Sequence, residues 1–206
     1  MRRRFDLVLV RIPLALAMIV AAGESNAQQK APVPDGAVLE ASQKAADELF
    51  GGRFRSAKTA ADKTAVAADM IAAAVKLEDG SADQYVLLKI ARDIASGAGD
   101  VATALQAVER QAERFDVPAA KLKAETLLTA AREATMTAQQ EAVAEAALPV
   151  VGDLTDADEI EQALDVCEAG RLAAQKSRQL ALVKELAAKV DDLKKQQASS
   201  QEYRRA

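Results

Sequence analysis

Alanine is the feature that most limits what this chain can fold into. It supplies 48 of the 206 residues, whereas aromatic residues make up only 3% of the sequence. Alanine has the highest helix propensity and one of the smallest side chains, so helices form readily and each buries little apolar area. No segment shows the two-residue alternation of β-branched and aromatic side chains that a strand needs. The composition therefore predicts an all-α fold. The turn signals along the chain add that its helices form antiparallel hairpins, stacked as a short array or elongated bundle with a long C-terminal helix.

Residues 1–27 have the three parts of a secretory signal peptide. A basic start, MRRRFDLVLVR, precedes an apolar run at residues 12–22, and the small residues Ser25 and Ala27 fit a cleavage site. The run is shorter than the roughly 20 residues that a transmembrane helix needs. We therefore expect cleavage near Ala27, export to the periplasm, cell envelope or exterior, and no membrane span in the mature chain. The alternative is an uncleaved membrane anchor.

Proline, glycine and polar residues divide the rest of the chain. Residues 28–37 predict a flexible linker, and residues 38–148 predict helical hairpins. The stretch PVVG at 149–152 predicts a break, followed by a C-terminal hairpin over residues 155–196 and a frayed tail over residues 197–206. Within these segments the pattern predicts a series of helices, among them ones at residues 38–50, 54–77, 118–148 and 171–196.

Three glycines predict the turns of the hairpins, because glycine is common just past a helix C-terminus. They are Gly52, Gly99 and Gly170. The signal is clearest in the middle of the chain, where Gly97 and Gly99 end one helix and Asp100 can cap the next. Two helices joined in this way form an αα-hairpin.

Residues 81–116 resemble a degenerate tetratricopeptide (TPR) repeat, which pairs two antiparallel helices. The residues that carry the resemblance are expected to pack the hairpin, and they are Leu88, Ala91, Ala95, Gly99, Ala104 and Val108. The chain departs from the family at Arg92, Gln111 and Asp116, where the family prefers a small residue, alanine and proline. The whole chain is also similar to alanine-rich hairpin regions of exported, uncharacterised bacterial proteins. The resemblance implies protein–protein contact through a concave helical face, and it implies no catalytic residue.

The residue inventory argues against an enzyme. Histidine is absent, which removes the commonest general base and the commonest transition-metal ligand. A single cysteine, Cys167, cannot build a Cys/His zinc site, and its place on an apolar stripe predicts an inert core thiol. Neither nucleotide-binding glycine motif appears, and the candidate acids stand where helix capping or i, i+4 pairing explains them. We predict no catalytic residue, no metal and no cofactor.

The charge balance does not fit a nucleic-acid binder. The chain has 31 acidic and 27 basic residues, a formal net charge of −4, whereas nucleic-acid binding needs a basic face. One basic cluster, formed by Arg53, Arg55 and Lys58, could contact an acidic partner. The alternative is a solvated helix start whose cations are offset by acids nearby, namely Asp47, Glu48 and Asp62.

These observations predict an exported, non-enzymatic helical scaffold or protein–protein interaction module of the cell envelope, with an unidentified protein partner. The alternative is a structural protein that self-associates through its C-terminal helix as a homodimer. That helix has heptad-spaced apolar residues, at Val183, Leu186, Val190 and Leu193. The same stripe would equally suit packing onto the preceding helix.

Overall fold

The computed structural model describes residues 30–205, so the predicted signal peptide lies outside the described residues. The described part is all-α, as predicted, and contains no strand beyond one isolated bridge. Its eight helices are α1 (Gly36–Ser56), α2 (Ala60–Ala74), α3 (Ala82–Gly97), α4 (Val101–Arg114), α5 (Ala119–Glu133), α6 (Thr137–Asp156), α7 (Ile160–Lys176) and α8 (Leu180–Arg205).

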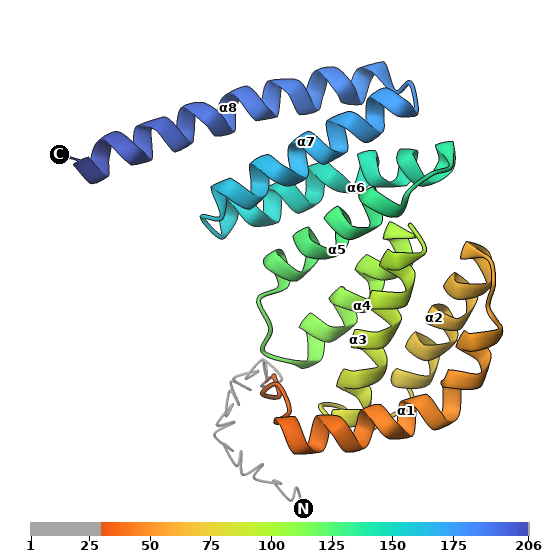
Figure 1. Ribbon diagram of the computed structural model, residues 1–206. Coiled ribbons are helices and arrows are strands. Elements are labelled where there is room, and N and C mark those ends of the chain that lie inside the picture. Colours follow the sequence, from red (N-terminus) through yellow and green to blue (C-terminus); the bar gives the residue numbers. More distant parts are fainter. Residues whose placement is uncertain (1–29, 206) are drawn as a thin grey trace, which may run out of the picture.

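The helices stack as an array of hairpins that runs from α1 at one end to α8 at the other (Figure 1). From α2 onward each helix packs against the next along the chain. The odd-numbered helices also form a row in which α1 touches α3, α3 touches α5 and α5 touches α7. The even-numbered helices form a second, looser row. The first helix is the exception, because α1 packs more extensively on α3 than on α2.

Alanine side chains fill much of the core between these helices. Two clusters of buried residues divide the array, one built from α1 to α4 and the other centred on α5 to α8. Alanines with no exposed surface occur in both clusters, and their small size lets neighbouring helices lie close together. The bulk comes from a few larger residues such as Phe115, which is fully buried and meets Tyr85 edge to face with 5.1 Å between ring centroids.

The hairpin of α3 and α4 is built as the sequence predicts. Five of the six residues expected to pack it are at most 1% exposed, namely Leu88, Ala91, Ala95, Ala104 and Val108. Gly99 forms the turn with a φ of +74°, and Asp100 caps α4 by accepting a 3.1 Å hydrogen bond from the backbone N–H of Thr103. A Cβ on Gly99 would also lie 3.2 Å from the backbone of Ala134. The glycine therefore serves the turn and the close approach of the next hairpin.

The predicted turn at Gly52 is wrong. Helix α1 continues through Gly51 and Gly52 to Ser56, and α2 begins behind a capping box. In that box the N–H of Asp62 donates to Thr59 Oγ1 at 3.1 Å, and the N–H of Thr59 donates to Asp62 Oδ2 at 3.0 Å. A reciprocal cap satisfies two helix-terminal donors, whereas a glycine alone only permits a turn.

The predicted turn at Gly170 is also wrong, because this glycine lies inside α7. A Cβ there would lie 2.3 Å from the Cβ of Ala147 in α6. Gly170 therefore marks a close approach of α6 and α7, and the turn falls later, where Arg178 has a φ of +62°.

Two predictions about this region are wrong, the single helix at 118–148 and the break at 149–152. Helix α6 runs through Pro149, and the chain instead turns between α5 and α6 at residues 134–136. Gln139 fixes that turn, because its Oε1 accepts from the backbone N–H groups of Thr135 and Met136 and its Nε2 donates to the carbonyl of Ala98 at 2.9 Å. This last contact ties the turn to the preceding hairpin.

Both ends of the described chain are more ordered than predicted. In the expected linker, the N–H of Ala31 donates to the carbonyl of Arg114, and the N–H of Asp116 donates to the carbonyl of Ala31, both at 2.8 Å. The expected frayed tail at 197–206 is helical as far as Arg205. Residues 30–35 precede α1 as non-helical chain, and residues 197–205 continue α8 as helix.

Candidate functional site

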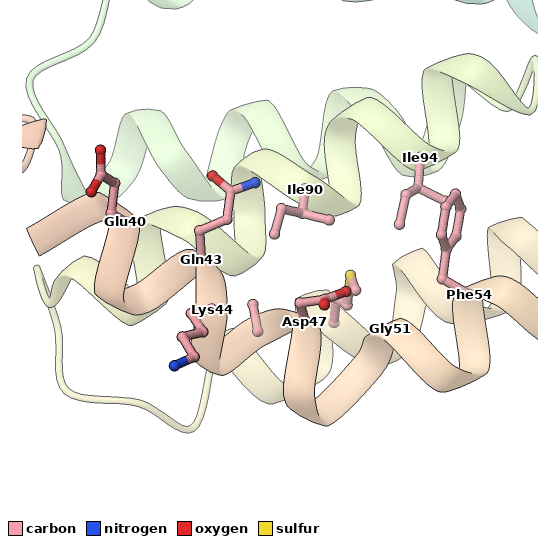
Figure 2. A pocket seen from close by; sticks show the side chains of 10 residues that line it. Glu40, Gln43, Lys44, Asp47, Gly51, Phe54, Ile90 and Ile94 are labelled. Carbon is pink, nitrogen blue, oxygen red and sulfur yellow. The ribbon is translucent and has the colours of Figure 1, made fainter. Parts of the chain in front are cut away.

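The candidate site is an open groove of about 610 Å³ between α1 and α3, with α2 beneath it. Figure 2 shows side chains of α1 and α3 pointing into the space between the two helices. Its apolar lining comes from Ala46, Phe54, Met70, Ile90 and Ile94. A volume of this size lies within the range of sites that bind small molecules or peptide side chains.

The groove exists because α1 buries only a narrow seam. Of its 21 residues only Ser42, Ala46 and Gly51 are buried. Ala46 holds α1 close to the body of the array through a small side chain, while Ile90 and Ile94 of α3 are only partly buried. The two isoleucines are one helical turn apart, so they line the same side of α3. The residues of α1 next to this seam are polar and leave the groove open.

The rim of the groove carries both signs of charge. Glu40, Lys44 and Asp47 follow one another along α1 at spacings of four and three residues, so they share one side of the helix. Asp47 lies 3.8 Å from the guanidinium of Arg55, and both side chains are more than two-thirds exposed. Water screens such a pair, and its contribution to stability is small. The rim therefore offers polar contacts around an apolar floor.

Phe54 closes one end of the groove, opposite Ile94 (Figure 2). Its side chain is 40% exposed. A partly buried aromatic ring beside two isoleucines is a common feature of binding surfaces. The spacing of Ile90 and Ile94 was visible in the sequence, but nothing in the sequence indicated that α1 would leave them uncovered.

The predicted basic cluster does not form a free cationic patch. Arg53 makes an ion pair with Asp69, Arg55 lies near Asp47, and Lys58 donates to the backbone carbonyl of Arg55 at 2.9 Å. Acids lie near both arginines, but only Asp47 is among the three acids that the alternative explanation names. Asp69 and Asp47 are these neighbours, whereas Asp62 belongs to the cap of α2 and has a pKa below its usual value because Thr59 hydrogen-bonds its carboxylate.

Cys167 lies in the core, as expected from its apolar stripe. Its side chain is fully buried, and the thiol donates to the backbone carbonyl of Leu186 at 3.2 Å. Burial raises the pKa of the thiol to about 11, and the nearby carboxylate of Glu168 adds to the effect. Thiols react through the thiolate, so Cys167 is unreactive at neutral pH.

The heptad-spaced apolar residues of α8 pack against the core of the same chain. Leu186, Val190 and Leu193 are at most 4% exposed and belong to the core around α7, while Val183 is partly buried against it. Packing onto the preceding helix therefore uses the residues that a C-terminal dimer seam would need.

A second, shallower cleft of about 430 Å³ lies where α2, α4 and α6 begin. Five of its eleven lining residues are alanines, and Gly99 and the 57% exposed Met136 also line it. Its lining is less varied in chemistry than that of the α1–α3 groove.

Within residues 30–205, no group of three or more cysteine, aspartate or glutamate side chains is arranged to hold a metal ion. No helix of this described part is long and apolar enough to cross a membrane. Comparison with family models, with curated proteins and with solved structures gave no match to this chain. The resemblance to the tetratricopeptide family therefore stays a prediction.

Proposed function

We propose that this chain is an exported, non-enzymatic interaction module of the cell envelope, and that the α1–α3 groove binds its protein partner. The observation that carries the proposal is the groove itself: an apolar floor, an exposed aromatic residue at one end and a charged rim. The predicted absence of catalytic residues, metal and cofactor is part of the same proposal.

The groove favours a partner segment with one apolar face. Grooves between helices commonly bind an amphipathic helix, whose apolar side chains enter the groove while its polar side stays in solvent. Ile90, Ile94 and Phe54 would contact the apolar side chains. Glu40 and Lys44 would contact charged groups at the edge of the bound segment, and such contacts set orientation more than affinity.

The test is site-specific photo-crosslinking in cells that produce the protein. A photoreactive phenylalanine analogue is placed at Ile94, inside the groove, and at Ala188, an exposed position on α8. We expect discrete protein adducts from position 94 that are absent from position 188. A second substitution, Ile90→Asp, should remove those adducts while leaving the helical circular dichroism unchanged. Identical adducts from both positions, or adducts that survive Ile90→Asp, would contradict the assignment of the groove.

Export is tested separately, by determining the N-terminus of the protein isolated from each cell fraction. We expect a chain that begins near Gln28 in the envelope or the medium. A chain that keeps Met1 and stays in the cytoplasm would refute export without affecting the groove.

A further inference from the structure

The outer side of α1 carries an exposed apolar stripe that the groove does not use. At 100° per residue, five residues fall within about 80° of arc, and they are Val38, Ala41, Ala45, Leu49 and Gly52. All five are exposed, with Val38 at 48% and Leu49 at 72%. The buried seam borders this stripe, with Ser42 about 20° and Ala46 about 60° beyond Leu49, whereas the groove side at Asp47 lies about 160° from Leu49.

This stripe is unusual for the end of a helical array. Terminal helices of stacked arrays normally present a polar outer surface, which keeps the array soluble. Helix α8, at the other end, exposes Lys184, Glu185, Asp191 and Asp192, and its most exposed apolar residue, Leu180, lies at its first position. On α1 the exposed apolar residues form a stripe along the helix, in which Leu49 is 72% exposed.

We propose that α1 is a self-association surface, on which α1 of a second copy packs in antiparallel orientation. The two-fold axis passes through Ala45. Two independent features of α1 support this arrangement, namely the sizes of the side chains along the stripe and the charges beside it.

The side-chain sizes are complementary only when the two helices are antiparallel. With Ala45 opposite Ala45, Leu49 of one copy faces Ala41 of the other, and Val38 faces Gly52. Each large residue then meets a small one, and the small residues let the helices approach closely. In the parallel alternative Leu49 faces Leu49, while the three small residues face one another across a gap. Uneven packing of that kind loses contact area.

The charges favour the same orientation. Lys44 and Glu48 are exposed on one flank of the stripe. In the antiparallel pair this flank meets the same flank of the partner, so Lys44 of each copy lies beside Glu48 of the other. A parallel pair brings each flank against the opposite flank of the partner, so these two charges do not meet. The apolar stripe spans residues 38–52, about two heptads of α1.

Cysteine crosslinking of the full chain tests the orientation. Ala45→Cys is expected to form a disulfide-linked dimer under mild oxidation, because position 45 lies on the two-fold axis. Val38→Cys alone should not, since the two copies of position 38 would be about 21 Å apart at 1.5 Å per residue, and a disulfide needs Cα atoms within about 7 Å. Mixing Val38→Cys with Gly52→Cys should restore crosslinking. The native Cys167 is buried and does not interfere.

Sedimentation equilibrium tests the association without crosslinks. Leu49→Glu is expected to weaken the dimer about tenfold or more, because a buried leucine is replaced by a charge next to an apolar surface. Leu180→Glu is the matched control, since Leu180 is 79% exposed but lies on α8, and it should leave the dissociation constant unchanged. Every variant keeps residues 1–29, so association through that segment would be common to all of them.

Three results would overturn the proposal: a monomer at every concentration, equal weakening by both glutamate variants, or crosslinking of Val38→Cys with itself. None of them bears on the groove, which is tested by substitutions at Ile90 and Ile94.

Discussion

Replacing Gly170 by alanine tests whether helix contact, and not a turn, explains this glycine. The new Cβ would lie 2.3 Å from the Cβ of Ala147 and 3.4 Å from Cδ1 of Leu186. Carbon atoms normally pack at about 3.5–4.0 Å. Ala147 is fully buried and its methyl group has no other rotamer to adopt. Helices α6 and α7 must therefore separate by about 1 Å or more at this point.

Two opposing effects set the magnitude. Alanine is favoured over glycine inside a helix by about 1 kcal/mol, whereas forcing extra volume into a packed core costs about 1–3 kcal/mol. Because backbone-fixed atoms make the closest contact, we take the upper part of that range and expect a net loss of about 1–2 kcal/mol. For a domain of this size the loss corresponds to a decrease in Tm of about 2–8 °C.

Gly152→Ala is the matched control, because Gly152 also lies inside a helix but nothing would touch its Cβ within 4 Å. We expect it to raise the free energy of unfolding by up to about 1 kcal/mol. Urea unfolding followed by circular dichroism measures both variants. In a double-mutant cycle, Ala147→Gly should relieve the cost of Gly170→Ala, giving a favourable coupling energy. Helix contact at Gly170 is refuted if Gly170→Ala stabilises the protein as much as Gly152→Ala does, or if Gly170→Ala and Ala147→Gly show no coupling.

Three further predictions follow from the geometry. Gly99→Ala should lower the free energy of unfolding by about 2–4 kcal/mol, because the positive φ of residue 99 and the nearby backbone of Ala134 both oppose a Cβ. Gly97→Ala, whose Cβ would have no atom within 4 Å, should be neutral or stabilising. Chemical unfolding of the two variants checks both expectations. Pro149→Ala should raise stability by about 1–3 kcal/mol in the same assay, since it restores a backbone donor inside α6, and a loss of stability would count against a continuous helix. Cys167 should resist alkylation in the folded protein at pH 8 and react at once in urea. Because its pKa rises from 9.0 to about 11 on folding, the unfolded chain loses this proton first, and stability should fall as pH increases from about 9 to 11; fast alkylation of the native protein would contradict the buried environment.

The α3–α4 hairpin could be predicted in detail because its signals are local and agree. Gly99 provides the left-handed turn, Asp100 provides the cap, and Ala104 provides the small contact surface, all within six residues. The turns at Gly52 and Gly170 could not be predicted from glycine alone. Inside a helix the same residue permits close packing, and the distinction depends on a neighbour such as Ala147, which is remote in sequence.

The α1–α3 groove could not be predicted from the sequence. The apolar character of Ile90 and Ile94 is evident in the sequence, yet core packing and groove lining give the same helical spacing. Only the placement of α1, which buries a narrow seam and leaves Phe54 partly exposed, separates the two outcomes. The same placement exposes Leu49.

The sequence by itself determined the type of secondary structure and some helix boundaries. An excess of alanine and a lack of strand patterns specify helices, and caps such as Asp100 specify where some of them begin, because propensity and capping depend on neighbouring residues along the chain. The tertiary structure decided which helix faces are covered. Helix α8 buries its heptad stripe on α7. Helix α1 instead leaves an apolar stripe exposed to solvent and an open groove on the side that faces α3. Burial depends on the distances between helices, and those are fixed by contacts between residues far apart in the sequence.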